Sequence, residues 1–150
     1  MVNLSECSLP LSNLPQLRME AVTTKRILII EDEANLRTVV RTCLEMLGGW
    51  EVLQASSGQE GLLLAQREKP DVILLDAMMP GMDGITVLEE LLAHPELQDI
   101  PVVFLTAKVE LTQPQRFLKL GARGAIAKPF NPLTLHNQVT TALGWDSELE

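Results

Sequence analysis

Short apolar runs alternate with helical patterns from residue 26 to residue 143. Each run is bounded by polar residues and is typical of a strand that is buried on both faces of a sheet. Between the runs, apolar residues recur with the spacing of one helix face, which predicts amphipathic helices. We expect strands at 27–30, 50–55, 71–75, 101–105 and 125–127, and helices at 36–47, 59–67, 85–92, 115–120 and 132–143.

Local signals mark where several of these helices begin and end. Gly48 and Gly49 follow the first helix, as glycines at helix C-termini commonly do. Asn131 is the expected N-cap of the last helix and Pro132 its first residue, because proline fits the first helical position. Cys43 falls on the apolar side of the first helix, so we expect a buried free thiol there. The residues of the third helix that we expect to face inward are Ile85, Leu88, Leu91 and Leu92.

Five strand-then-helix units with short connections predict an α/β fold, a doubly wound parallel sheet of five strands with helices on both faces. A chain of 150 residues has room for one such domain. We expect the folded domain at 25–145. Residues 1–24 are rich in Ser, Asn and Pro without a sustained period, which predicts a flexible leader, and Met19 offers an alternative translation start. Residues 146–150 form an acidic tail.

The composition narrows the classes of partner. With 46% apolar and 21% charged residues, the chain is typical of an ordinary globular protein. Its net charge of −8 argues against binding to nucleic acid or to an anionic membrane, because both favour clustered Lys and Arg. No stretch approaches the roughly 18 apolar residues of a membrane span. Glu6, Pro10 and Pro15 do not suit a signal peptide, so we expect a cytoplasmic location.

Polar residues follow four of the five predicted strands. Glu31 and Asp32 follow the first strand, Asp76 the third, Thr106 the fourth and Lys128 the fifth. Any one of them alone is typical of a helix cap, a turn or a solvated charge. Because the carboxyl ends of parallel strands meet at one edge of the sheet, where ligands of such folds bind, the five together indicate a site.

Crowded carboxylates repel one another, and a hard divalent cation such as Mg²⁺ relieves that repulsion. Asp76 is then placed to act as a nucleophile, since carboxylates can form acyl phosphates. Lys128 can neutralise phosphoryl oxygens, and the hydroxyl of Thr106 can donate a hydrogen bond to one of them. The sequence offers no Ser–His pair or Cys nucleophile for this site. His94 and His136 lie on or just after helices away from it, as expected of surface residues.

Four ordered segments carry a family resemblance. Residues 27–33, 74–84, 105–107 and 127–130 resemble the motifs of the receiver domain of two-component response regulators, and the resemblance runs from about 25 to 143. It implies a flavodoxin-like (βα)5 sheet with strand order 2-1-3-4-5. It also implies a switch that catalyses only its own Mg²⁺-dependent phosphorylation and dephosphorylation.

The resemblance implies a role for each site residue. Asp76 would be phosphorylated by a sensor histidine kinase or a phosphotransfer protein. Asp32, Asp76 and the backbone carbonyl of Met78 would bind Mg²⁺ (or Mn²⁺). Glu31 stands where Asp is more usual and would act through a metal-bound water.

Thr106 and Lys128 would bind the phosphoryl group, with a cis peptide bond between Lys128 and Pro129. Met78 and Lys108 would flank the path of the water that hydrolyses the acyl phosphate.

The expected output route has one departure from the family. Receivers often carry an aromatic residue three positions before the Lys, which is the non-aromatic Ala125 in this chain. Because few residues follow the last helix, we expect a stand-alone receiver that signals by protein–protein contact through its fourth helix, fifth strand and fifth helix. Homodimerisation through that face stays open, as do the cognate kinase and the downstream target.

Three alternatives compete with this interpretation. A phosphatase or phosphotransferase that uses an aspartyl phosphate would need a carboxylate two residues after the nucleophile, where Met78 stands. A cofactor-binding α/β module would need a Gly-rich loop after the first strand, where the sequence has Glu-Asp-Glu at 31–33. A degenerate receiver that is never phosphorylated is disfavoured by the intact set of acids, Thr and Lys.

Overall fold

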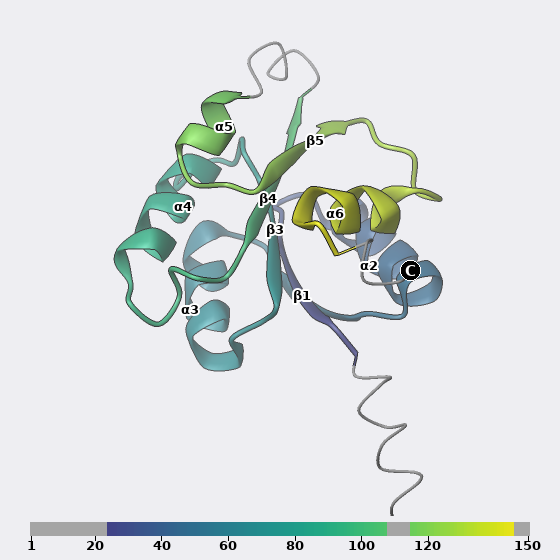
Figure 1. The fold of residues 1–150 in the computed structure, drawn as a ribbon, viewed down its shortest axis with the longest axis horizontal. Coiled ribbons are helices and arrows are strands. Elements are labelled where there is room, and N and C mark those ends of the chain that lie inside the picture. Colours follow the sequence, from purple (N-terminus) through teal and green to yellow (C-terminus); the bar gives the residue numbers. More distant parts are fainter. Residues whose placement is uncertain (1–23, 108–114, 146–150) are drawn as a thin grey trace, which may run out of the picture.

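The computed structural model describes residues 24–107 and 115–145, which form a five-stranded sheet with helices on both faces (Figure 1). The predicted leader, the acidic tail and Lys108 lie outside the described residues, apart from residue 24. All strand pairs are parallel and the strand order is β2-β1-β3-β4-β5, so the predicted fold class is confirmed. The strands are β1 (Arg26–Ile30), β2 (Glu51–Ala55), β3 (Val72–Asp76), β4 (Val102–Ala107) and β5 (Gly124–Lys128).

Helices cover the two faces of the sheet in two groups, seen on either side of the strands in Figure 1. One face carries α3 (Gly58–Glu68), α4 (Gly84–Ala93) and α5 (Gln115–Lys119), and the other carries α2 (Ala34–Gly48) and α6 (Leu135–Leu143). Every residue of β3 is buried, because this central strand packs against helices on both sides. Among the described residues, no helix is long and apolar enough to cross a membrane.

The register of the central strands positions their polar ends. In the ladder between β1 and β3, Ile30 pairs with Leu75, so the next residues, Glu31 and Asp76, leave the sheet side by side. The backbone N–H of Glu31 donates to the carbonyl of Ala55, 3.1 Å away, which extends the β1–β2 ladder by one residue. The ends of the two buried strands therefore place two carboxyl groups next to each other.

Side-chain caps fix the starts of two helices. The hydroxyl of Ser57 accepts a hydrogen bond from the backbone N–H of Glu60 at 3.1 Å, at the start of α3. The carboxylate of Asp83 accepts from the N–H of Thr86 at 2.9 Å, at the start of α4. Each cap satisfies one of the backbone donors that a helix leaves unpaired at its N-terminus.

The last helix begins later than its sequence signals predict. Asn131 caps a turn instead, because its Oδ1 accepts from the N–H of Leu133 at 2.9 Å and its carbonyl accepts from the N–H of Thr134 at 3.1 Å. The α-helix then begins at Leu135. Asn131 and Pro132 are equally suited to the start of a turn, so the predicted N-cap and first helical residue were wrong.

Some predicted core positions of the helices are exposed. Leu92 is 36% exposed and does not face inward, whereas Leu88 and Leu91 are buried as predicted. Cys43 is a free thiol, but it is only half-buried. The apolar stripe of α2 is wider than the surface that it packs against, since Val40 and Leu44 are the residues of this helix that are fully buried. The sequence pattern alone cannot distinguish the covered part of such a stripe from the rest.

Candidate functional site

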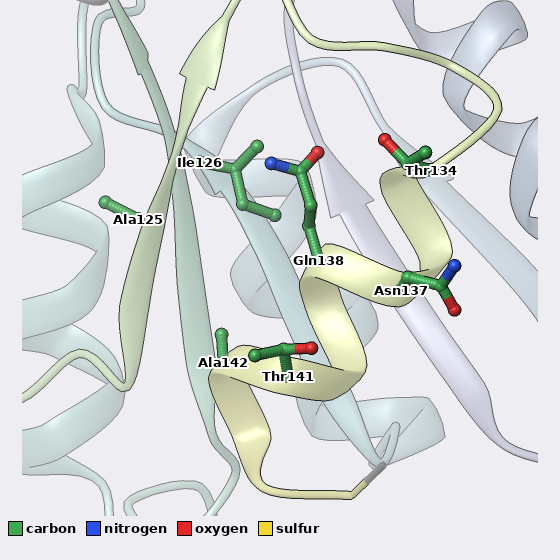
Figure 2. Close-up of a pocket in the computed structure, with 7 residues that line it drawn as sticks. All are labelled: Ala125, Ile126, Thr134, Asn137, Gln138, Thr141 and Ala142. Atoms are coloured by element: carbon green, nitrogen blue, oxygen red, sulfur yellow. The ribbon is translucent and has the colours of Figure 1, made fainter.

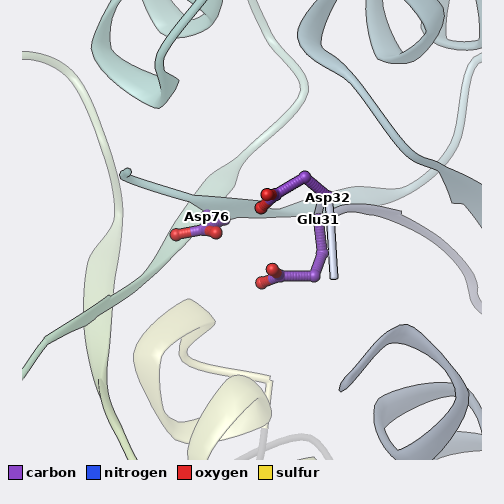
Figure 3. Close-up of side chains that lie close together, drawn as sticks. All are labelled: Glu31, Asp32 and Asp76. Atoms are coloured by element: carbon purple, nitrogen blue, oxygen red, sulfur yellow. The ribbon is translucent and has the colours of Figure 1, made fainter. Parts of the chain in front are cut away.

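An acidic cluster lies at the carboxyl ends of β1 and β3. Figure 3 shows the side chains of Glu31, Asp32 and Asp76 turned toward a common point, and one carboxylate oxygen of each lies within 4.8 Å of the others. Glu31 and Asp76 are 1% and 2% exposed, whereas Asp32 is exposed to solvent. Two of the three carboxyl groups are thus almost fully buried, and the third is open to solvent.

The ammonium group of Lys128 reaches both buried acids. The Nζ of Lys128 lies 3.2 Å from Oδ1 of Asp76 and 3.6 Å from Oε1 of Glu31. Lys128 is the last residue of β5, and β5 pairs with β4 in a register that places Lys128 beside Ala107. The peptide bond between Lys128 and Pro129 is cis, as the resemblance implies.

Thr106 contributes a buried hydroxyl that lacks a partner. It is 0% exposed near the end of β4, and its Oγ1 forms no hydrogen bond within the part of the chain that the structure describes. A buried hydroxyl without a partner is costly unless a ligand or water satisfies it. The position of Thr106 beside the end of β3 therefore suits an oxygen-rich ligand bound at Asp76.

The electrostatics of the cluster favour a bound cation. Burial, followed by the negative charge of Asp76, raises the pKa of Glu31 from 4.5 to about 7. A hydrogen bond from the N–H of Glu33, at 3.2 Å, and the charge of Lys128 oppose this rise only in part. Hard oxygen donors that repel one another fit Mg²⁺, which commonly takes one or two carboxylates and keeps several waters.

The loop after β3 is shaped around Asp76. Its Oδ1 also accepts a hydrogen bond from the backbone N–H of Met78 at 3.0 Å, which holds the carboxylate against the loop. The side chain of Met78 is 62% exposed and points its bulk into solvent. Gly84 packs so closely on the backbone of Asp76 that an added Cβ would overlap the Asp76 carbonyl oxygen. This close approach accounts for glycine at the start of α4.

The predicted switch position lies on the edge strand. Ala125 pairs in register with Phe104, is half-buried, and packs against the core on the α5 side of the sheet. A cavity of about 480 Å³ lies between β5 and α6, and Ala125 and Ile126 line it together with residues of α6 (Figure 2). In that view the methyl group of Ala125 points away from α6, whereas Ile126 points toward it.

Neither histidine belongs to the acidic cluster. His94 follows α4, and its Nδ1 accepts from the N–H of Glu96 at 3.2 Å. His136 lines a cavity of about 350 Å³ with Trp50 and Trp145, near the amino ends of the strands. Both histidines are half-buried rather than fully on the surface.

One site residue has no counterpart in the sequence prediction. The NH1 group of Arg37, one turn into α2, donates to the backbone carbonyls of Glu31 at 2.8 Å and Asp32 at 3.2 Å. The only signal in the sequence is a cation six positions after Glu31, within a helix whose other face is apolar. That signal does not distinguish a solvated charge from a residue that binds the loop.

Comparison with known proteins gives the family. Residues 27–140 match the model of the response regulator receiver domain. The chain is 39% identical over 119 residues to the alkaline phosphatase synthesis transcriptional regulatory protein PhoP of Bacillus subtilis, a match that covers 79% of this chain and 48% of PhoP. It is 41% identical over 111 residues to the phosphate regulon transcriptional regulatory protein PhoB of Pseudomonas aeruginosa, covering 74% and 48% of the two chains.

The structure is likewise similar to that of the chemotaxis response regulator CheY4 of Vibrio cholerae, with a TM-score of 0.73 and 31% sequence identity. That match covers 80% of this chain and 99% of CheY4.

The chain therefore belongs to the response regulator receiver domains of two-component systems. Receiver domains are signalling switches that bind Mg²⁺ at an acidic pocket and interact with histidine kinases or phosphotransfer proteins. The acidic cluster of this chain has the donors that such a pocket needs. The chain spans about half the length of the curated relatives it matches.

Proposed function

We propose that Asp76 accepts a phosphoryl group from the phosphohistidine of a sensor kinase or phosphotransfer protein. The observation that carries this proposal is the surrounding of one buried carboxylate by complementary groups. Asp76 is 2% exposed, the Nζ of Lys128 lies 3.2 Å from it, and two further carboxylates complete a cation-binding cluster. Such a set suits a carboxylate that carries additional negative charge after reaction.

In the forward step, a carboxylate oxygen of Asp76 attacks the phosphorus of the donor. The phosphorus–nitrogen bond of the phosphohistidine breaks, and its electron pair returns to the imidazole of the partner. Hydrolysis reverses the modification, since water attacks the phosphorus and the carboxylate of Asp76 leaves as inorganic phosphate forms. Both steps move a charged phosphoryl group through a site that already holds negative charge, so they need compensating cations.

Each neighbouring residue has a role in this proposal. Asp32, Asp76 and the carbonyl of Met78 would hold Mg²⁺, with Glu31 acting through a bound water, and the ion would supply positive charge for the phosphoryl oxygens. Lys128 moves from its contact with the Asp76 carboxylate to a phosphoryl oxygen.

The hydroxyl of Thr106, which has no hydrogen-bond partner among the described residues, donates to another phosphoryl oxygen, and this contact pulls the end of β4 toward the site.

The output follows from what lies next to Thr106. In β5, Ala127 pairs with Thr106 and Ala125 pairs with Phe104, so a shift of β4 is transmitted directly to the edge strand. We propose that α5, β5 and α6 together form the face that a protein target contacts. Because position 125 carries only a methyl group, the moving element is the backbone of β4.

The test is phosphorylation by a small phosphodonor, which needs no partner. Wild-type protein in Mg²⁺ should gain the mass of one phosphoryl group, and Asp76→Asn should gain none. Chelation with EDTA should also abolish the gain. Labelling of Asp76→Asn, or labelling of the wild type that persists in EDTA, contradicts the proposal.

A further inference from the structure

The side chain of Arg37 joins the first turn of α2 to the acidic loop. Its NH1 group donates to the carbonyls of Glu31 and Asp32, at 2.8 and 3.2 Å. The backbone N–H of Arg37 donates to the carbonyl of Glu33 at 3.0 Å, so three consecutive carbonyls of the loop accept hydrogen bonds from one residue. The side chain is half-buried, as expected of a group that is held in place.

The two carbonyl contacts explain how adjacent carboxylates reach one point. In an extended strand, successive side chains point to opposite faces of the sheet, so Glu31 and Asp32 would diverge. The chain instead bends at Asp32, and the carbonyls of both residues turn toward the same guanidinium nitrogen. Turning both peptide groups in this way brings both carboxylates toward Asp76 (Figure 3).

Asp32 depends on this bend more than Glu31 does. Glu31 is buried, and its N–H extends the β1–β2 ladder. The Asp32 side chain is exposed and forms no hydrogen bond to another residue in the described ranges 24–107 and 115–145. The backbone of residues 31–33 therefore sets the direction of the Asp32 carboxylate, and Arg37 holds that backbone.

The charge of Arg37 has the opposite effect on a cation site. Within the described part of the chain, the guanidinium group forms no close ion pair with a carboxylate, and the charge of Glu60, whose pKa it helps to lower, acts on it only from a distance. Its positive charge therefore also acts on a cation bound at the cluster. A like charge close to a bound cation weakens binding by repulsion. Removal of the charge alone would strengthen the binding of Mg²⁺, whereas loss of the orientation would weaken it. The direction of the change thus separates the two effects.

We propose that Arg37 is a positioning residue, which holds the carbonyls of Glu31 and Asp32 so that both carboxylates face the Mg²⁺ site. This inference rests on the proposed function, because it assigns Arg37 a part in preparing that site. The residue acts through the loop and does not itself touch the cation or the phosphoryl group.

The experiment measures the dissociation constant of Mg²⁺ by calorimetry for the full chain and three variants. Arg37→Met should raise the constant about tenfold or more, the range typical when a group that orients metal ligands is lost. Arg37→Lys keeps the charge and one donor and should give an intermediate value. Arg41→Met is the matched control, since Arg41 lies one turn further along α2 and pairs with Glu45 at 4.0 Å. Its constant should stay within about twofold of wild type.

Urea unfolding in EDTA shows whether each variant is folded before Mg²⁺ is added. A folded Arg37→Met protein that binds Mg²⁺ as tightly as wild type, or more tightly, overturns the inference. If Arg37→Met does not fold, Arg37→Lys decides the question, and an unchanged constant for that variant overturns the inference.

Failure of the proposed function has a different signature. A wild-type protein that binds Mg²⁺ but is not phosphorylated at Asp76 would end the proposed function, while weaker binding by Arg37→Met would still support the role of Arg37 in the cation site. Conversely, a wild-type protein that is phosphorylated, with an Arg37→Met variant of unchanged affinity, would end the role of Arg37 alone.

Discussion

The charged groups at the two ends of β1 and β3 differ in how well they are paired within the protein. At the amino end, Arg26 has partners for its backbone N–H and for each of its three guanidinium nitrogens. Its backbone N–H donates to the carboxylate of Asp71 at 2.8 Å, and its guanidinium donates to the carbonyl and to Oε1 of Glu68, both at 2.7 Å. Its Nε also lies 3.6 Å from the carboxylate of Glu51. The guanidinium group thus joins β1 to β2 and α3, and Arg67 also pairs with Glu68 at 3.3 Å.

At the carboxyl end of the same strands, the ammonium group of Lys128 pairs with two acids, Asp76 and Glu31, while Asp32 has no ion pair in the described residues. The hydroxyl of Thr106 and Oε1 of Glu31 are buried without a hydrogen-bond partner in the described residues. The pKa of Glu31 is raised, which means that the fold disfavours its charged form. The charged groups at one end of the strands are therefore paired within the protein, whereas the other end keeps buried polar atoms without partners, which a cation and a phosphoryl group would satisfy in the proposed function. The comparison indicates where stability and function lie along the same two strands.

A matched pair of substitutions gives the largest contrast between the two ends. Asp32→Asn and Asp71→Asn each remove one negative charge next to a buried strand. We expect Asp32→Asn to weaken Mg²⁺ binding by roughly tenfold or more, because one ligand charge is lost from the cluster. Asp71→Asn should leave the Mg²⁺ affinity within about twofold of wild type, since long-range charge effects are screened by salt. Equal losses in calorimetry would mean that the acids of the two ends are not distinct in role.

A substitution at the amino end should instead change the free energy of unfolding and leave Mg²⁺ binding unchanged. Arg26→Met should lower the free energy of unfolding, because the hydrogen bonds to Glu68 and the ion pair with Glu51 are lost, and partial exposure of these partners limits the size of the loss. Urea unfolding in EDTA measures the loss, and calorimetry should show unchanged Mg²⁺ binding. A variant that unfolds as wild type does would show that the amino-end pairs contribute nothing measurable.

A smaller effect concerns the pH dependence of stability without Mg²⁺. The folded protein holds the proton of Glu31 up to about pH 7, whereas the unfolded chain loses it near pH 4.5. Between these values the folded state binds more protons, so the contribution of Glu31 to stability is present below pH 4.5 and is lost as the pH rises through about 7. Asp76 favours the proton on Glu31, while Lys128 and the N–H of Glu33 oppose it.

The difference between wild type and Glu31→Gln separates the effect of this group on stability from that of the other carboxyl groups, whose contributions are the same in both proteins. Glu60, Glu68 and Asp83 have lowered pKa values because of their hydrogen bonds, and they stabilise the fold as the pH rises. In EDTA, wild type should lose stability relative to Glu31→Gln between about pH 4.5 and 7. Mg²⁺ should reduce the loss, because it favours the carboxylate form. A difference between the two proteins that is independent of pH would contradict the raised pKa.

Most of the fold could be predicted from the sequence because buried parallel strands are continuous apolar runs. The runs at 27–30 and 71–75 gave β1 and β3 nearly to the residue. The polar residues that follow these runs gave the composition of the acidic cluster. Local signals failed where one signal serves two structures, as with Asn131, whose side chain caps a turn as well as it caps a helix.

Contacts between side chains and the backbone were beyond the reach of sequence patterns. Arg37 donates to two backbone carbonyl groups. Because every residue has a backbone carbonyl, no pattern of residue types indicates this contact. Leu92 likewise belongs to the apolar stripe of α4 in the sequence, yet it is 36% exposed in the fold. The residues of the site were predictable from their chemistry, whereas the residue that holds them in place required the three-dimensional structure.

The most direct measurement is the position of the phosphoryl group itself. Protein treated with a small phosphodonor in Mg²⁺ would be reduced with borohydride, which converts an aspartyl phosphate to homoserine, and then mapped by peptide mass spectrometry. The account predicts homoserine at position 76 and unmodified Asp at position 32. Homoserine at Asp32, or phosphoprotein without homoserine at position 76, would contradict the central claim.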